Sequence, residues 1–206
     1  MAQVRHVVIA RRTQLAAPPG ADRIQSLFGF LAQSEPRNAL IVGDILGSLA
    51  DGRTPLVLTE RKDHLNRLAE ILQKTAAAEV IVLSGGMGRR NQVAALDRLG
   101  RSSDEHPRIV LATGRFVGEG FDDPRLDTLF LAMPISWRGT LQQYAGRLHR
   151  DNAGKHEVRI YDYVDAAVPA LARMFKKRLR GYQAMGYTVA QSGGELRTSQ
   201  LPLNHH

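Results

Sequence analysis

The sequence contains no cysteine among its 206 residues. This absence excludes disulfide bridges, zinc sites built on thiolates and a thiol nucleophile. A run of eighteen apolar residues, about the length that a membrane-spanning helix needs, is also missing. We therefore expect a cytoplasmic protein that makes no contact with a membrane.

Aromatic residues are scarce, at 6% of the chain. Proteins that bind single strands without a motor commonly stack bases on aromatic side chains, so this scarcity argues against a simple binding module. The charge is one-sided, with 28 Lys and Arg against 20 Asp and Glu and a formal net charge of +8. A basic chain gains affinity for a polyanion by releasing condensed counterions, so a nucleic acid is the expected partner.

Short apolar runs alternate with amphipathic segments along most of the chain. Strands are predicted at 4–10, 55–59, 79–86, 107–113, 126–134 and 156–164, and helices at 24–33, 37–50, 61–76, 91–100, 137–150 and 166–186. Such alternation predicts an α/β fold of three layers, a parallel sheet with helices on both faces. Ligands of such sheets sit beyond the carboxyl ends of the strands.

The last predicted helix carries the basic cluster KKRLR at 176–180. Two interpretations are open, since these side chains would either line a nucleic-acid track or merely solvate one face of the helix.

The segment QQYAGRLHR (142–150) places a glycine inside a predicted helix. At 100° per residue, one stripe of this helix is apolar and comprises Leu141, Tyr144, Ala145 and Leu148. The opposite stripe carries an amide and two guanidiniums, from Gln143, Arg147 and Arg150. Guanidiniums bind phosphate with fixed geometry, and Gly146 beside them would let a backbone or a ligand come close.

The glycine-rich segment ATGRFVGEGFD (112–122) follows a predicted strand. Backbone N–H groups in such a loop grip phosphate oxygens. Thr113 adds a hydroxyl, and Asp122 is placed to accept a hydrogen bond from a sugar hydroxyl.

Taken in order, these segments resemble the second RecA-like domain of superfamily 2 helicases. ATGRFVGEGFD is similar to motif V of that family, and QYAGRLHR fits its motif VI pattern Q-x-x-G-R-x-x-R. PLVLTERKDHLNRLAEIL looks like motif IV with its helix, and LSGGMGRR looks like the motif IVa region. The GEGFD form and the phrase MPISWRGTLQQYAGRLHR resemble most the DEAD/DEAH-like helicase subunit of type III restriction systems.

The resemblance implies a role for each matching residue. The arginine fingers on the γ-phosphate of ATP would be Arg147 and Arg150. Further contacts to ATP would come from Gln143, Gly120 and Asp122. The nucleic-acid backbone would be contacted by Thr59, Arg61, Gly85, Gly86, Arg89, Thr113 and Gly114. No residue is expected to hold a metal ion.

The P-loop pattern G-x-x-x-x-G-K-[ST] and an acidic box for Mg²⁺ are missing from the sequence. ATP and Mg²⁺ would therefore be held mainly by an N-terminal RecA-like domain of the same polypeptide, and this chain alone is expected to be inactive as an ATPase. The expected organisation is a linker strand with bracing helices (1–51), the helicase domain (52–165), and a basic helix with a flexible tail (166–206). DNA is the expected partner, with RNA left open and with restriction-modification or nuclease proteins as further candidates.

Three alternatives remain at this point. The first is a stand-alone nucleic-acid-binding module without ATPase activity. The second is a nucleotide-binding transferase on a doubly wound sheet, although the G-x-G-x-x-G of such enzymes is missing. The third is a degenerate motor domain that serves as a scaffold.

Overall fold

The computed structural model describes residues 4–16, 23–101, 106–114, 123–135, 140–148 and 155–191. Within these residues the strands are β1 (Arg5–Arg12), β2 (Pro55–Thr59), β3 (Glu79–Leu83), β4 (Arg108–Thr113), β5 (Thr128–Leu131), β6 (Glu157–Val164) and β7 (Thr188–Gln191). The helices are α1 (Ile24–Gln33), α2 (Glu35–Ala50), α3 (Lys62–Thr75), α4 (Arg89–Arg101), α6 (Thr140–Leu148) and α7 (Pro169–Ala184). The predicted strands and helices are thus confirmed, although several bounds differ. Residues 137–139 and 149–150 of the helix predicted at 137–150 lie outside the described residues.

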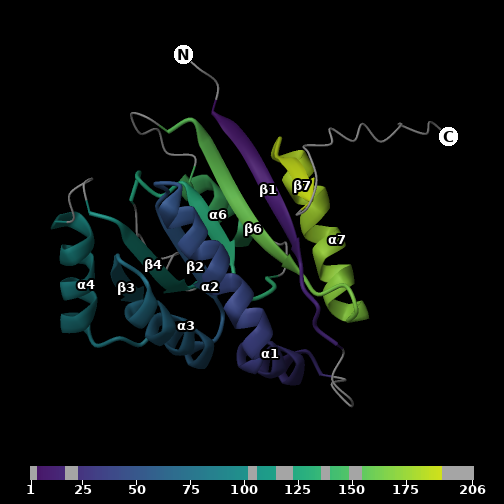
Figure 1. The fold of residues 1–206 in the computed structure, drawn as a ribbon, viewed down its shortest axis with the longest axis horizontal. Coiled ribbons are helices and arrows are strands. Elements are labelled where there is room, and N and C mark those ends of the chain that lie inside the picture. Colours follow the sequence, from purple (N-terminus) through teal and green to yellow (C-terminus); the bar gives the residue numbers. More distant parts are fainter. Residues whose placement is uncertain are drawn as a thin grey trace.

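The seven described strands form a single sheet in the order β3-β4-β2-β5-β6-β1-β7 (Figure 1). Every pairing in it is parallel. All strands therefore end at the same edge of the sheet, and the segments that follow β2, β3, β4 and β5 meet there.

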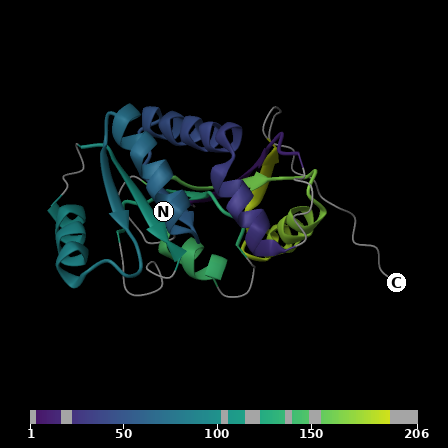
Figure 2. The ribbon, with the colours of Figure 1, turned by 90° about the horizontal axis from the view of Figure 1, so that it is seen from below.

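Helices cover both faces of this sheet, as the alternation of side chains along β2 requires. Leu56 and Leu58 pack into one core cluster with residues of α4, α6 and α7. Val57 between them points to the other face and packs with residues of α2 and α3. Figure 2 shows α2 and α3 on one side of the sheet and α6 on the other. The predicted three-layer α/β fold is confirmed.

Helix α1 packs away from these two clusters, near the carboxyl edge of the sheet. Its residues Leu27 and Leu31 are buried in a third cluster with Met133, which follows β5, and with Leu171 of α7. Helix α1 therefore forms a wall beside the segment that leads from β5 towards α6.

The two ends of the described chain meet in the sheet. Strand β1 pairs with β6 over eight residues, from Arg5 with Glu157 to Arg12 with Val164. Strand β7 pairs with the other side of β1. The sequence did not predict β7, because the four residues TVAQ are too short to show a strand pattern. Residues Ala190 and Gln191, expected to begin a weakly ordered tail, are paired in the sheet.

Neither interpretation of the KKRLR cluster holds for Arg178. This residue is 1% exposed, and its guanidinium pairs with the equally buried carboxylate of Asp162 on β6. Lys176, Lys177 and Arg180 are exposed, as a solvated helix face requires.

Among the described helices, none combines the length and the apolar character that crossing a membrane would need.

Candidate functional site

The loops that follow β3 and β4 are joined at the carboxyl edge of the sheet. The backbone N–H of Gly85 donates a hydrogen bond to Thr113 Oγ1 over 3.1 Å. Gly86 has φ +81°, a conformation that favours glycine, and a Cβ added to it would lie 3.0 Å from Lys62 Nζ. The structure thus brings Gly85, Gly86, Thr113 and the start of α3 together, although up to 51 residues separate them.

The side chain of Thr59 belongs to a buried network. Its Oγ1 lies 3.0 Å from His64 Nδ1, and His64 Nε2 lies 2.9 Å from Asn38 Oδ1. Since the amide nitrogen of Asn38 donates to the Ala32 carbonyl, its oxygen is the acceptor for His64 Nε2–H. The Thr59 hydroxyl then donates to Nδ1 of a neutral histidine. Burial, with Arg37 as the next cause, lowers the pKa of His64 to about 3.

This network decides what residue 59 can contribute at the surface. Thr59 is 1% exposed, and its hydroxyl is committed to His64. The expected contact of Thr59 with a nucleic acid is therefore restricted to its backbone.

Two polar side chains converge on Gly114, the residue directly after β4. A Cβ added to Gly114 would clash with the Tyr144 hydroxyl and with Glu60 Oε1, so only glycine fits there without rearrangement. Burial raises the pKa of the Glu60 carboxyl. Burial and the neighbouring Glu60 carboxylate raise the pKa of Tyr144. Sequence reasoning missed Glu60, because a glutamate after a strand acquires meaning only when α6 is placed beside it.

Four cationic side chains stand at the beginnings of α3 and α4. Arg61 is held by Asp63 through two hydrogen bonds of 2.9 and 2.8 Å. Lys62, Arg89 and Arg90 are exposed, and no ion pair is recorded for them in the described part of the chain. Since helix N-termini attract anions, these positions suit phosphate groups. Lys62 was missed in the sequence because a lysine that opens a helix is common on any surface.

Helix α6 buries the predicted stripe. Leu141, Ala145 and Leu148 are fully buried and Tyr144 is 2% exposed. Gln143 and Gly146 lie on the exposed side, and a Cβ added to Gly146 would meet nothing within 4 Å. The amphipathic pattern of this helix is thus confirmed, and the exposed face around Gly146 is open to a partner or a ligand.

Several predicted ATP contacts fall outside the described residues. Of Arg147 only the backbone, in α6, is described. Gly120, Asp122 and Arg150 lie outside the described ranges altogether. In the described part of the chain, no three His, Asp or Glu side chains are grouped so that they could hold a metal ion.

Buried arginines hold the segment that leads from β5 towards α6. Arg37 Nη1 donates to the Ala132 carbonyl over 2.6 Å, and Arg178 Nη1 donates to the Ile135 carbonyl over 3.1 Å. Each arginine is also paired with a buried aspartate. The start of the connection to α6 is therefore fixed by α2 and α7.

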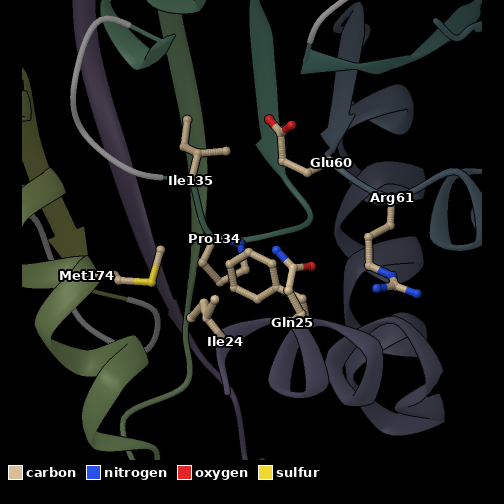
Figure 3. A pocket seen from close by; sticks show the side chains of 8 residues that line it. Ile24, Gln25, Glu60, Arg61, Pro134, Ile135 and Met174 are labelled. Carbon is tan, nitrogen blue, oxygen red and sulfur yellow. The ribbon is translucent and has the colours of Figure 1, made fainter. Parts of the chain in front are cut away.

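A cleft of about 520 Å³ opens between α1 and the ends of β2 and β5 (Figure 3). Its lining combines apolar side chains with a carboxylate, an amide and a guanidinium, and comprises Ile24, Gln25, Phe28, Glu60, Arg61, Pro134, Ile135 and Met174.

The parallel sheet is covered by helices on both faces, and glycine turns, cations and an amphipathic helix lie at its carboxyl edge. This arrangement defines a RecA-like α/β domain. The family model described as helicase conserved C-terminal domain matches residues 38–152, more than half of the chain. The chain belongs to this family, so the resemblance to superfamily 2 helicases is confirmed at that level.

Solved structures agree on the fold. T4 UvsW has a TM-score of 0.68 at 13% identity, over 91% of this chain and 41% of that one. The C-terminal domain of the DEAD-box protein Dbp5 has a TM-score of 0.59 at 14% identity, over 93% of this chain and 92% of that one. At such low identity these similarities show the fold alone.

Curated relatives are found among poxviruses. Transcript termination protein A18 of camelpox virus (strain CMS) is 26% identical over 148 residues, which are 70% of this chain and 29% of that protein. Transcript termination protein A18 of fowlpox virus (strain NVSL) is 26% identical over 140 residues, 67% of this chain and 29% of that protein. The chain thus spans under a third of the length of these relatives. The narrower resemblance to type III restriction subunits stays a prediction.

Proposed function

We propose that this chain is the second motor domain of an ATP-dependent helicase or translocase that acts on nucleic acid. One observation carries the proposal: in this helicase C-terminal domain, the segments that follow β2, β3 and β4 lie together with α6 at one edge of the sheet. The Gly85 N–H bond to Thr113 and the contact of Gly114 with Tyr144 join the segments that resemble motifs IVa, V and VI.

One part of this edge suits a nucleic-acid backbone. Backbone N–H groups at Gly86 and Gly114, together with Arg61 and Arg89, would contact phosphates as the resemblance implies. Gly85 would lie beside the phosphates, while its own N–H donates to Thr113. Lys62 joins this set because its ammonium lies beside Gly86. Contacts of this kind do not read bases, so binding would depend strongly on salt and little on sequence.

The exposed face of α6 suits the nucleotide. Gln143 is exposed there, and the resemblance adds Arg147, Arg150, Gly120 and Asp122. An arginine that reaches a transferring phosphoryl group neutralises charge that develops in the transition state. ATP with Mg²⁺ would be held mainly by a preceding RecA-like domain, since this chain has no P-loop. The isolated chain would therefore not hydrolyse ATP efficiently.

The finer assignments belong to the same proposal. We favour DNA over RNA, a cytoplasmic location, and a division into a linker with bracing helices (1–51), a motor domain (52–165) and a C-terminal extension (166–206). Strands β1 and β7 share one sheet with the motor segment, so these three parts would act as a unit. Partnership with restriction-modification or nuclease proteins depends on the type III resemblance alone.

The test is the substitution Arg150→Ala in the full-length protein. ATP turnover should fall by about 10³-fold or more, because an arginine finger acts in the transition state, while DNA binding stays nearly unchanged. Arg180→Ala, on the exposed side of α7, is the matched control and should leave both quantities unchanged. An equal loss of turnover and of DNA binding in Arg150→Ala would contradict the assigned role. Full DNA binding by a native protein that has no ATPase would favour the stand-alone binding module.

A further inference from the structure

The cleft beside α1 lies where the connections of the sheet reverse. The chain leaves β2 through α3 towards β3 on one side, whereas after β4 it crosses to β5 on the other side of β2. In open parallel sheets, the crevice beyond the carboxyl ends at such a point is where ligands bind. Glu60 and Arg61 follow β2, and Pro134 and Ile135 follow β5, so the cleft occupies this crevice. Its volume of about 520 Å³ is ample for a nucleobase with its sugar.

The walls of the cleft are suited to a flat, partly apolar group. Ile24 and Phe28 come from α1, Met174 comes from α7, and Pro134 comes from the segment that follows β5. Ile24 is 42% exposed, so apolar surface is left uncovered at this position. A nucleobase would cover such surface, because every base has an apolar π-face.

Glu60 and Gln25 are the polar side chains of the cleft that are left for a ligand, because Arg61 is paired with Asp63. The side chain of Glu60 is exposed at the carboxyl edge, and its carboxylate forms no hydrogen bond or ion pair within the described part of the chain. The surrounding protein partly desolvates this carboxylate and so raises the pKa of Glu60. A ligand that donates a hydrogen bond to the carboxylate would favour its charged form. Gln25 places an exposed side-chain amide on the α1 side of the same cleft (Figure 3). A carboxylate accepts hydrogen bonds only, so it selects an exocyclic amino group of a base. Thymine has one N–H donor on its pairing edge, but the carbonyl oxygens on either side of it would repel a carboxylate.

The mouth of the cleft adjoins the cations proposed to contact phosphates. Arg61 lines the cleft, and Lys62 follows it directly at the start of α3. A strand that runs along these cations would pass the opening with its bases within reach of the cleft. A base could then enter while the adjacent phosphates stay on the surface.

We propose that this cleft holds one unpaired nucleobase that bears an exocyclic amino group (adenine, cytosine or guanine), turned out of the bound strand, and that Glu60 selects it against thymine. The inference rests on the proposed function, because it requires a strand bound along the carboxyl edge. It adds a base-selective contact to a surface that otherwise reads only phosphates.

The experiment uses the 206-residue chain and fluorescence anisotropy with labelled dT octamers. Their central residue is adenine, cytosine, guanine, thymine or an abasic site, so that only one base differs. Octamers with an amino-bearing central base should bind about five- to tenfold more tightly than those with thymine or the abasic site, as a good base contact allows.

The variant Glu60→Gln keeps the size of the side chain but adds a donor that suits thymine, so the preference should fall below about twofold. Glu70→Gln removes the same charge from an exposed site of α3 and should keep the full preference. Far-UV circular dichroism of each variant confirms that it is folded. A preference that persists in Glu60→Gln would overturn the assignment to this cleft.

The failure of this inference is distinguishable from failure of the proposed function. Equal binding of all five octamers would overturn the base pocket and leave the nucleic-acid contact standing. No binding of any octamer would contradict the nucleic-acid contact itself and the pocket with it. Competition by AMP, CMP and TMP distinguishes a base within a strand from the base of a free mononucleotide. If they show the Glu60-dependent preference while the octamers do not, the ligand is a mononucleotide and the strand proposal is wrong.

Discussion

Arg178 on α7 and Asp162 on β6 form a bidentate ion pair in the interior, although each is only 1% exposed. Arg178 Nε and Nη2 donate to the two carboxylate oxygens of Asp162 over 2.7 and 2.8 Å. The Tyr182 hydroxyl donates to the same carboxylate over 2.8 Å. Together with the bond from Arg178 to the Ile135 carbonyl, this pair ties the C-terminal helix to the segment that leads towards α6.

Substitution of one partner should therefore destabilise the domain strongly. Arg178→Met leaves the buried Asp162 carboxylate without its main partner, and we expect the free energy of unfolding to fall by about 3–5 kcal/mol. Urea unfolding followed by circular dichroism measures this change. The matched control is Arg180→Met on the exposed face of the same helix, which should change the free energy of unfolding by less than about 0.5 kcal/mol. A similar, small effect of both substitutions would show that the pair does not fasten α7.

His64 should make stability depend on pH in the acid range. Its pKa is lowered to about 3 in the folded protein, whereas the unfolded chain protonates near pH 6.5. The unfolded state thus binds more protons between these values, so the stability is full above pH 6.5 and declines as the pH falls towards 3. We expect a loss of about 2 kcal/mol between pH 6.5 and pH 5 from this group.

Urea titrations at several pH values test this expectation. His64→Gln should flatten the decline, because glutamine does not titrate, even if the variant is less stable throughout. His156→Gln, at an exposed position before β6, should keep the wild-type slope. A decline of equal steepness in His64→Gln would mean that other groups cause it.

Gly114→Ala should be destabilising because its Cβ has no room. The Tyr144 hydroxyl that it would meet belongs to a side chain only 2% exposed, which cannot simply swing away. We expect a loss of about 1–3 kcal/mol, as for overpacking in a core. In the double variant with Tyr144→Phe, part of this loss should be recovered, since the clashing oxygen is gone. Thermal unfolding of the two single variants and the double variant measures the coupling.

Gly146→Ala provides the opposite case on the same helix. Its Cβ would meet nothing within 4 Å, so alanine should stabilise α6 by about 0.5–1 kcal/mol. Destabilisation by Gly146→Ala as large as that by Gly114→Ala would contradict the open environment of residue 146.

The cations at the starts of α3 and α4 should set the salt dependence of DNA binding. Lys62→Ala and Arg89→Ala should each weaken binding at all sequences and lower the slope of log K against log salt by about 1. Anisotropy titrations between low and moderate salt measure the slope. Lys74→Ala is the control, since Lys74 lies at the other end of α3 and pairs with Glu70. Unchanged slopes for Lys62→Ala and Arg89→Ala would place the nucleic acid elsewhere.

The sequence by itself determined the local elements and their order. PLVLT is typical of a strand, because successive apolar residues point to the two faces of a buried sheet. The sequence of α6 is typical of a helix, because Leu141, Tyr144 and Leu148 recur at the helical period. The segments that resemble motifs IV to VI could likewise be named from the sequence, since each depends on a short run of neighbouring residues.

Only the tertiary structure decided which residues far apart in the chain act together. The pairing of β1 with β6 and β7, the burial of Arg178 within a basic cluster, and the cleft between α1 and Glu60 all depend on contacts across the domain. No local pattern encodes these contacts, because whether a charged side chain is solvated or buried depends on what packs against it. For the same reason, the Thr59 hydroxyl is hydrogen-bonded to a neutral His64, whereas the sequence suggested that Thr59 contacts nucleic acid at the surface.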